Sequence, residues 1–317
     1  MNNYLTPLVS VLIPTFNSEK YIEQCVESVL NQTYRNIEII INDNNSDDKT
    51  SKIIKSYLLN SNKIHFEVNK KNIGPVLNWH KCVERATGEY AILLFSDDML
   101  APDCLQKLVG MITSETIGFA YSSVIHLDES RAEENKNIIY ISGVTGKYSS
   151  KKFIDGHFIA NKDEYPQSPA CALFRRKDLL ESLESPNEDY MKVGYENHGA
   201  GPDQKIYFDT LIKYDSFGYV NSPLVIFRSH KSNLSKKKEV NLAYAISKSQ
   251  YLMKISKIFT ENELKKIRAE QFYLLMRLKR IDLYEKSMKW DDDRYRMNYY
   301  WLVKKIFSKL KIKAKNK

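Results

Sequence analysis

Two adjacent aspartates, Asp97 and Asp98, lie just beyond a short apolar segment, residues 90–94 (YAILL). Such a run is typical of a buried parallel strand, and open α/β sheets bind ligands beyond the carboxyl ends of their strands. Paired carboxylates there can hold Mg²⁺ or Mn²⁺, which prefer oxygen ligands and bridge to substrate phosphates. The alternative is that the two aspartates only cap the next predicted helix, residues 102–113. The pair therefore predicts either a divalent-cation site or a helix cap.

The segments around the aspartates alternate between strand-like and helix-like patterns. We expect four further strands, at residues 9–13, 37–41, 64–68 and 117–121. Helices are expected between the strands: one capped by Asn17 and Ser18 and ending near Gln32, one reaching about Leu59 and one ending near Ala86. Strands that alternate with helices predict right-handed βαβ units and a mostly parallel α/β sheet.

Three polar loops follow predicted strands, at residues 14–17, 42–47 and 96–98. In a parallel sheet these loops share one edge, where nucleotides commonly bind. The chain lacks a glycine-rich dinucleotide fingerprint after its first predicted strand, and it lacks the phosphate-loop pattern. A diphosphate bound at this edge would therefore need a cation to balance its charge, and Asp97 and Asp98 could hold one.

Composition excludes several classes of protein. The 317 residues contain no apolar run of about 20 residues, so no transmembrane helix is expected. The first residues resemble no export signal. The four cysteines are far apart and include no Cys-x-x-Cys pair, which indicates thiols in a reducing compartment and neither a zinc site nor a disulfide framework. We therefore expect a cytoplasmic protein.

The charge is divided unevenly along the chain. Residues 1–230 carry 24 Lys and Arg against 30 Asp and Glu, a net −6, whereas residues 231–317 carry 24 against 9, a net +15. Near the C-terminus an apolar stripe at helical spacing is flanked by lysines, over residues 303–313. Such a helix would bind an anionic membrane surface, which predicts a peripheral protein at the inner face of the cell membrane. The alternative is that the stripe packs on the body of the protein.

A set of motifs in a fixed order resembles the family 2 glycosyltransferases, which have the GT-A fold. The motifs are residues 9–17 (VSVLIPTFN), 28–34, 38–43, 72–74, 86–90, 96–98 and 102–103, with a weaker continuation at 201–203 and 223–230. The resemblance implies a GT-A catalytic domain over residues 1–230. Its donor-binding half would cover about 8–123 and its acceptor-binding half about 124–230, with a basic helical region at 231–317.

The resemblance also implies a donor site for a nucleotide-sugar. Pro14, Thr15, Phe16 and Asp43 match contacts to the nucleotide base, with Glu19 a weaker candidate. The alternative for Asp43 is a role in the polar turn and helix cap that follow it.

The remaining matched positions concern the ribose, the metal and the acceptor. Asp97 matches the carboxylate that contacts the ribose, and Asp98 the one that binds Mn²⁺ or Mg²⁺. His230 resembles a position that can reach the metal or the diphosphate, although a lone histidine is often structural. Asp203 matches the general base that deprotonates an acceptor hydroxyl, with Asp209, Asp215 and Glu196 as nearby competitors.

The sequence departs from the family pattern at several positions. Asn42 and Asn44 replace the usual aspartate and glycine on either side of Asp43, and Asn44 is expected to tolerate a left-handed backbone. Trp79 and His80 replace an Arg-Asn pair, so one basic contact to the donor is in doubt, and Trp79 is expected to pack in the core. Pro202 stands before Asp203 where a glutamate is common.

These observations favour an inverting, metal-dependent glycosyltransferase. It would use a nucleotide-sugar, most simply a UDP-sugar, and a glycan or lipid-linked saccharide acceptor in bacterial surface glycan synthesis. A sugar nucleotidyltransferase is the alternative enzyme, but residues 14–18 are not the glycine- and arginine-rich loop that it requires. A binding protein with a nucleic-acid-binding tail is the third possibility. No nucleic acid partner is expected, because the body is acidic and carries no motif that reads DNA or RNA.

Overall fold

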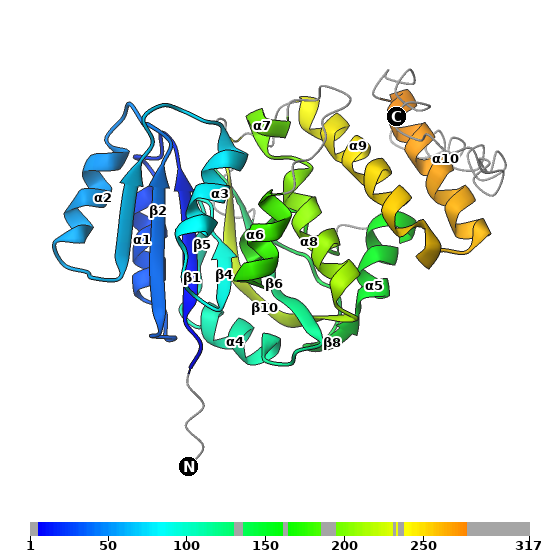
Figure 1. Cartoon of the computed structure of the whole chain (residues 1–317), viewed down its shortest axis with the longest axis horizontal. Helices are drawn as coiled ribbons and strands as arrows, with labels where there is room; N and C mark the ends of the chain where they lie inside the picture. The colour runs from blue at the N-terminus through cyan, green and yellow to red at the C-terminus, as the bar shows by residue number, and fades with distance from the viewer. Residues whose placement is uncertain are drawn as a thin grey trace, which may run out of the picture.

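A ten-stranded mixed sheet forms the centre of the molecule in the computed structural model (Figure 1). The structure describes residues 6–129, 136–160, 164–184, 195–230, 233 and 238–277. The predicted amphipathic helix at residues 303–313 lies outside these ranges. The strands are β1 (Val9–Thr15), β2 (Ile37–Asp43), β3 (Ile64–Val68), β4 (Tyr90–Leu93), β5 (Met99–Leu100), β6 (Ile117–Asp128), β7 (Lys136–Ile139), β8 (Gly146–Ser149), β9 (Ala172–Arg175) and β10 (Ser216–Ser229).

Helices cover both faces of this sheet. The described α-helices are α1 (Ile22–Leu30), α2 (Thr50–Leu58), α3 (Pro75–Arg85), α4 (Cys104–Ile112), α5 (Ser150–Asp155), α6 (Arg176–Glu184), α7 (Tyr195–His198), α8 (Pro202–Lys213), α9 (Lys238–Ile255) and α10 (Glu261–Arg277). Short helical turns lie at η1 (Gly156–Ala160), η2 (Pro169–Cys171) and η4 (Ser256–Ile258). This arrangement confirms the predicted α/β class with helices around a mostly parallel sheet.

The strand order is β3-β2-β1-β4-β9-β6-β10-β5, with β7 beside β6 and β8 beside β10. The first four strands pair in parallel, as their sequences predict. The predicted fifth strand is present as β6, but it does not adjoin β4, because β9 lies between them and is antiparallel to both. Strands β1, β2 and β4 therefore end at one edge of the sheet, as expected.

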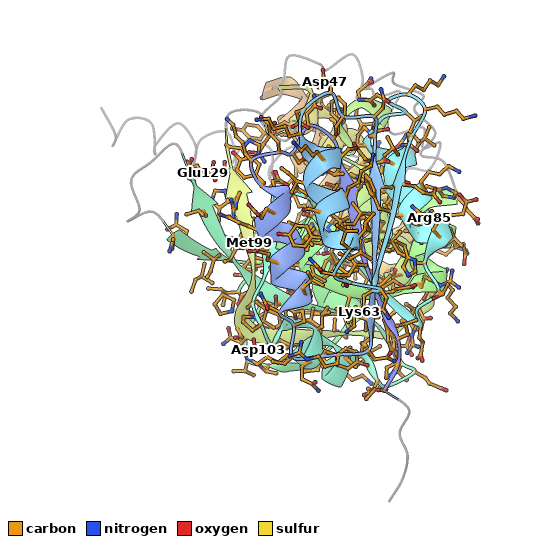
Figure 2. All side chains as sticks on the ribbon, turned by 90° about the vertical axis from the view of Figure 1, so that its left-hand side faces the viewer. Asp47, Lys63, Arg85, Met99, Asp103 and Glu129 are labelled. Carbon is orange, nitrogen blue, oxygen red and sulfur yellow. The ribbon has the colours of Figure 1, made fainter. Side chains whose placement is uncertain are left out.

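Figure 2 shows how the chain reaches this edge and returns. Asp47, in the loop after β2, lies at the top of that view, whereas Lys63 and Asp103 lie towards the bottom. The chain rises along β4, reverses at Asp97 and Asp98, and descends through β5, which pairs antiparallel with β10. The two aspartates thus form the reversal itself.

The hydrophobic core extends from the sheet to the last described helices. Strands β1, β2 and β4 are buried along their whole length, consistent with their apolar sequences. Side chains of α9 and α10, including Tyr251, Leu252 and Leu264, belong to the same buried cluster as the sheet. All four cysteines are buried and unpaired, and no helix in the described ranges has the length and apolar character needed to cross a membrane.

One local prediction at a helix start was wrong. Helix α1 begins at Ile22, so Asn17 and Ser18 do not cap it with their side chains. Asn17 has a left-handed backbone (φ 48°), and the Ser18 carbonyl accepts the amide hydrogens of Tyr21 and Ile22. Asn44 is not left-handed; that conformation belongs to Asn45 (φ 66°). Asparagine tolerates this geometry at either position, so the sequence pattern alone could not locate the turn.

A buried carboxylate ties the strands together at the end of the sheet opposite the aspartate pair. Glu38 on β2 accepts hydrogen bonds from the Ser10 hydroxyl (2.6 Å) and from the amides of Thr87 (2.6 Å) and Gly88 (3.0 Å). Burial alone would raise the pKa of Glu38, but these hydrogen bonds bring it below its ordinary value. Gly88 packs so closely on β1 that a Cβ atom would lie 2.6 Å from Ser10 Oγ and 2.8 Å from the Leu8 carbonyl oxygen.

Gly88→Ala should therefore lower the free energy of unfolding by about 1–3 kcal/mol, because the new methyl group meets backbone atoms that cannot move aside cheaply. The matched control is Gly110→Ala on the exposed face of α4, where a Cβ atom would meet nothing within 4 Å. That variant should gain about 0.5–1 kcal/mol from the better helix propensity of alanine. Urea denaturation of both variants tests the pair, and equal stabilities would contradict the close packing at Gly88.

Candidate active site

The loops after β1 and β2 are joined side by side at the upper edge of the sheet. The Asn17 amide donates to Ser46 Oγ (2.9 Å), and the Asp47 amide donates to Asn17 Oδ1 (3.0 Å). The Ser18 amide donates to Thr50 Oγ1 (2.7 Å). These bonds fix the short segment that contains the predicted base contacts Pro14, Thr15 and Phe16.

Two of those predicted contacts have properties suited to a ligand. Thr15 lies at the end of β1, is buried, and has an Oγ1 atom with no hydrogen-bond partner within the described parts of the chain. A buried hydroxyl without a partner is costly unless something else satisfies it. Phe16 is 45% exposed, which is unusual for a large aromatic ring and leaves its face open to a flat ligand. Pro14 is buried within β1.

Asp43 and Glu19 both organise these loops. Asp43 is fully buried, and its carboxylate accepts the amide hydrogen of Ser46 (3.0 Å) and the hydroxyl hydrogens of Ser46 and Ser51. Glu19 is exposed and accepts the amide hydrogen of Lys49 (3.0 Å). The turn-forming alternative for Asp43 is therefore realised, and a contact from either residue to a nucleotide base stays a prediction.

A group of asparagines behind Asp43 holds the loop after β2 to α3. Asn42 Nδ2 donates to Asn78 Oδ1 (2.7 Å), and Asn78 Nδ2 donates to the Asn42 carbonyl oxygen (3.0 Å). Asn44 Oδ1 accepts the Ile73 amide hydrogen (2.9 Å), and Asn44 Nδ2 donates to Asn72 Oδ1 (2.8 Å). Because an amide both donates and accepts, asparagine can fill the positions where the family pattern has aspartate and glycine.

The helix-cap alternative for Asp97 and Asp98 is wrong. Helix α4 begins six residues after Asp98, its N-cap residue is Asp103, and it has no side-chain cap. Asp98 Oδ1 instead accepts the amide hydrogen of Arg228 on β10 (3.0 Å), across the β5–β10 pairing. The chain reversal therefore presents both carboxylates to the end of β10.

His230 and Asn233 face Asp97 from beyond the end of β10. His230 Nε2 lies 3.1 Å from Asp97 Oδ2, and Asn233 Nδ2 donates to the same oxygen (3.0 Å). The ring of His230 stacks on Tyr21, with centroids 4.7 Å apart. Residues that are 133 positions apart in the sequence thus meet in one group, and a contact of His230 to a metal or diphosphate stays a prediction.

The electrostatics of this group favour a cation. Asp98 is 5% exposed, and burial together with the charge of Asp97 raises its pKa well above its ordinary value. Two adjacent carboxylates with an imidazole beside them fit Mg²⁺ or Mn²⁺, which keep several ligands from water and substrate phosphates. Within the described ranges, no three or more His, Cys, Asp or Glu side chains form a complete metal site by themselves. A metal at this group would need further ligands from water or substrate.

Asp203 forms a second acidic centre at the start of α8. Its Oδ1 atom accepts the amide hydrogens of Gly201 (2.8 Å) and Gln204 (2.7 Å), and its Oδ2 atom accepts the hydroxyl hydrogen of Tyr244 on α9. Burial raises the pKa of Asp203 to about 7, against the lowering effect of these hydrogen bonds. A carboxylate that titrates near neutral pH is suited to accept a proton from a hydroxyl group.

The competitors of Asp203 have other surroundings. Asp209 pairs with the buried Lys205 (2.6 Å), and Asp215 is exposed beyond the end of α8. Glu196 lies on α7, and its side chain is outside the described atoms. Of the two described competitors, one is already paired with a cation and the other faces solvent, so Asp203 remains the predicted base.

Trp79 connects the two acidic centres. Its ring packs against Phe95, two residues before Asp97, with centroids 5.4 Å apart. Its other side lies against Gly199, where a Cβ atom would overlap the indole. Gly199 in turn accepts the amide hydrogen of Asp203 (3.2 Å). Trp79 is 5% exposed, so the prediction that it packs in the core is confirmed.

Sequence reasoning missed three residues of the site. The Tyr21 ring stacks on the His230 ring, and the Arg228 guanidinium also lies over it, 5.3 Å from the ring centroid. Asn233 supports Asp97, and Tyr244 supports Asp203. No motif marks any of them. The one available signal was the spacing of Tyr244, Ser247 and Tyr251, which places polar groups on one face of a helix.

Comparison with known proteins finds similarity to glycosyltransferases. Residues 10–183 match the family model described as glycosyl transferase family 2. The chain is 27% identical to the glycosyltransferase GlyG of Streptococcus pneumoniae over 139 residues, which is 44% of this chain and 45% of GlyG. It is 32% identical over 104 residues to a Campylobacter jejuni GalNAc(5)-diNAcBac-PP-undecaprenol beta-1,3-glucosyltransferase, covering 32% of this chain and 34% of that enzyme. The chain spans about half the length, or less, of the curated relatives that it matches most strongly.

Solved structures share the fold over most of the chain. Residues 1–349 of Staphylococcus aureus TarS, solved with UDP-GlcNAc, superpose with a TM-score of 0.61 at 17% identity, covering 89% of this chain and 90% of that one. The mannosyltransferase PcManGT of Pyrobaculum calidifontis, solved with GDP-Man and Mn²⁺, gives a TM-score of 0.56 at 16% identity, covering 90% and 74%. At these identities the likeness concerns the fold.

The raised pKa of Asp203 predicts a stability that depends on pH. The folded protein holds this proton more tightly than the unfolded chain, so the stabilisation is complete below the unfolded pKa of about 4 and is lost as the pH rises through about 7. Asp203→Asn removes the charge and keeps an oxygen for the two amides. It should be more stable than the wild type by about 2–4 kcal/mol at pH 8, with the difference disappearing towards pH 4.

Thermal and urea unfolding between pH 4 and pH 8 measure this difference. Asp215→Asn is the control, because it removes an exposed carboxylate outside the network and should change stability little at any pH. A constant difference between Asp203→Asn and the wild type across this range would show that the carboxyl group titrates normally in the folded protein.

Proposed function

This chain belongs to glycosyl transferase family 2, and from that premise we propose that it transfers a sugar from a nucleotide-sugar to a hydroxyl group of a glycan or lipid-linked saccharide. The setting would be bacterial surface polysaccharide synthesis, with a UDP-sugar as the first donor to test. The observation that carries the proposal is the buried Asp98 beside Asp97 at the carboxyl end of β4, with His230 brought next to them.

The donor would lie across the loops after β1 and β2. Phe16 offers an exposed ring on which a base can stack, and Thr15 offers a buried hydroxyl that lacks a partner in the described parts of the chain. Asp43 and Glu19 keep those loops in place and are the proposed carboxylates for the base edge. Asp97 is the proposed contact to the ribose, and Asn233 steadies it by donating to its Oδ2 atom.

Asp98 and His230 would hold Mg²⁺ or Mn²⁺. When bound, the metal supplies a Lewis acid that stabilises negative charge on the departing diphosphate. The protein prepares this position by burying Asp98, which disfavours solvation of its charge by water, and by anchoring it to the Arg228 amide. Stacking on Tyr21 fixes the orientation of the His230 ring.

Asp203 would act at the acceptor. As an acceptor oxygen forms its bond to the anomeric carbon, its proton passes to the Asp203 carboxylate. The bond between that carbon and the diphosphate oxygen breaks, and its electron pair leaves with the diphosphate. Attack from the face opposite the leaving group inverts the anomeric configuration. A positioned base of this kind contributes about 10²–10⁴-fold to the rate.

The relatives support this assignment of substrates. One is named for transfer to a diphospho-undecaprenol-linked saccharide, and the TarS fragment was solved with UDP-GlcNAc. A lipid-linked acceptor would suit the basic amphipathic sequence at residues 303–313, which we propose attaches the enzyme to the inner face of the cell membrane.

Calorimetric titration of UDP in the presence of Mn²⁺ tests the donor site. The wild type should bind UDP, and EDTA should abolish most of the heat of binding. Asp98→Asn should weaken binding at least about tenfold, since it removes a charge from the proposed metal position. The matched control is Asp103→Asn, which changes a partly exposed aspartate five residues away, paired with Lys107 at the opposite end of the sheet.

The two possible failures have different meanings. Equal, manganese-dependent binding of UDP by Asp98→Asn and the wild type would remove Asp98 from the metal site. Binding of GDP or another nucleotide in place of UDP would leave the site intact and change only the base.

Turnover tests the proposed base. Asp203→Asn should lower the rate of UDP release from UDP-GlcNAc, UDP-glucose or UDP-galactose by about 10²–10⁴-fold, because a neutral amide cannot accept the proton. Its affinity for UDP should equal that of the wild type. Asp215→Asn should retain full activity, and a similar rate for Asp203→Asn would move the base to another residue.

A further inference from the structure

Helix α9 reaches the active site from a part of the chain that the sequence assigns to the basic C-terminal region. Its Tyr244 hydroxyl donates to Asp203 Oδ2. Burial, together with the negative charge of Asp203 beside it, holds the pKa of Tyr244 well above the ordinary value, so this hydroxyl stays protonated and acts as a donor. Asp203 is thus held by one side chain from α9 and by two backbone amides of its own loop.

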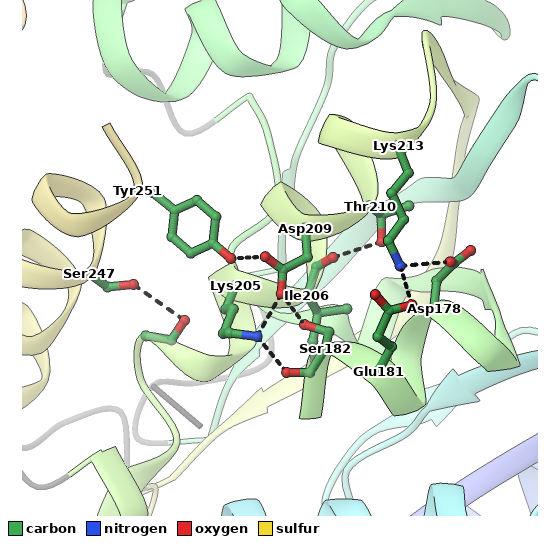
Figure 3. Close-up of polar contacts among 11 residues, drawn as sticks. Asp178, Glu181, Ser182, Lys205, Ile206, Asp209, Thr210, Lys213, Ser247 and Tyr251 are labelled. Atoms are coloured by element: carbon green, nitrogen blue, oxygen red, sulfur yellow. Dashed lines mark hydrogen bonds and ion pairs between the residues drawn. The ribbon is translucent and has the colours of Figure 1, made fainter. Parts of the chain in front are cut away.

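Three polar groups on one face of α9 dock this helix onto α8. They are spaced at i, i+3 and i+7: Tyr244, Ser247 and Tyr251. Ser247 Oγ lies 3.4 Å from the Gly201 carbonyl oxygen, and the Tyr251 hydroxyl donates to Asp209 (Figure 3). Asp209 is also paired with Lys205, whose Nζ atom lies 2.6 Å from Asp209 Oδ2 and 2.6 Å from the Ser182 carbonyl oxygen. Helix α9 therefore contacts two carboxylates of α8 in different settings. Asp203 accepts the hydroxyl hydrogen of Tyr244, whereas Asp209 accepts that of Tyr251 and is also paired with Lys205.

Within the described parts of the chain, the hydrogen bonds of Asp203 leave one acceptor position open. A carboxylate oxygen accepts about two hydrogen bonds. Oδ1 already has two, from the amides of Gly201 and Gln204, whereas Oδ2 has one, from Tyr244. The remaining acceptor position of the carboxylate is therefore on Oδ2, beside the tyrosine hydroxyl, and the tyrosine fixes its direction.

We infer that Tyr244 is a positioning residue for Asp203, which aims the free acceptor position of Oδ2 at the sugar acceptor and favours the ionised carboxylate. This inference rests on the proposed function, in which Asp203 is the general base. It also makes α9 part of the catalytic unit.

Among the described side chains, Tyr244 is the one that hydrogen-bonds to the Asp203 carboxylate, and Tyr140 interacts electrostatically with Tyr244. On α7, His198 accepts the amide hydrogen of Ala200 through Nδ1. On α8, Lys205 is paired with Asp209, and farther along Lys213 is paired with Asp178 and Glu181 of α6 (Figure 3). From α3, the packed side chain is the uncharged Trp79. The hydrogen bond from Tyr244 lowers the pKa of Asp203 towards neutral pH, so removing it should raise that pKa further.

The test compares Tyr244→Phe with Tyr251→Phe, since each removes one hydroxyl that donates from α9 to a carboxylate on α8. The pH dependence of kcat/KM is measured by UDP release from UDP-GlcNAc, and UDP affinity is measured with Mn²⁺. Tyr244→Phe should move the acid limb upward by about one pH unit and lower the rate about fivefold at pH 7, with UDP affinity unchanged. Tyr251→Phe should lower the melting temperature and leave the acid limb in place.

Unfolding provides a second readout that needs no turnover. Because Tyr244 stabilises the charged form of Asp203, Tyr244→Phe should lose more stability at pH 8 than at pH 5. Tyr251→Phe should lose the same amount in both buffers, since Asp209 keeps Lys205. An unmoved acid limb, or an equal loss at pH 5 and pH 8, would reduce Tyr244 to a contact that docks the helix and would overturn the inference.

Asp203→Asn separates this inference from the proposed function. Wild-type turnover in Asp203→Asn would refute the assignment of Asp203 as the base, whatever Tyr244 does. If Asp203→Asn is inactive but Tyr244→Phe behaves like Tyr251→Phe, Asp203 stays the general base and Tyr244 is not its positioning residue.

Discussion

The antiparallel pairing of β5 with β10 determines the geometry of the proposed metal position. It reverses the chain at Asp97 and Asp98, and it places the Arg228 amide 3.0 Å from the Asp98 carboxylate. A buried carboxylate is unfavourable unless a partner compensates its charge, and a single backbone amide compensates it only partly. The pairing therefore leaves an acidic position that is rigid, nearly dry and still in need of a cation.

Three buried carboxylates show how hydrogen bonding separates structural from chemical roles. Glu38 receives hydrogen bonds from Ser10, Thr87 and Gly88, which outweigh its burial and lower its pKa. Asp98 lies beside Asp97 and accepts one backbone amide hydrogen, and burial together with the charge of Asp97 raises its pKa. Asp203 lies between these cases, because burial raises its pKa to about 7 although two amides and a tyrosine act to lower it. The fully satisfied carboxylate fastens the far end of the sheet, and the other two remain available to a metal or a proton.

The sequence predicted what depends on local pattern and could not predict what depends on distant pairing. Apolar runs and the loops after them located β1, β2 and β4 and the shared edge where Thr15, Asp43 and Asp97 lie. The place of β9 between β4 and β6 depends on a strand from beyond residue 170, whose short sequence has no distinguishing pattern. Asn233 was missed for a related reason, because a single polar side chain gives no signal until the fold brings its partner close.

Trp79 explains how a departure from the family pattern can be accommodated. An arginine at this position would be expected to contact the donor directly. The Trp79 indole is instead 5% exposed and packs inside the protein. It fills the space between Phe95, which leads into the two aspartates, and Gly199, which leads into Asp203. Gly199 has a left-handed backbone (φ 71°) and no side chain, so the loop can pass directly against the ring. A rigid aromatic side chain thereby sets the separation between the proposed metal position and the proposed base.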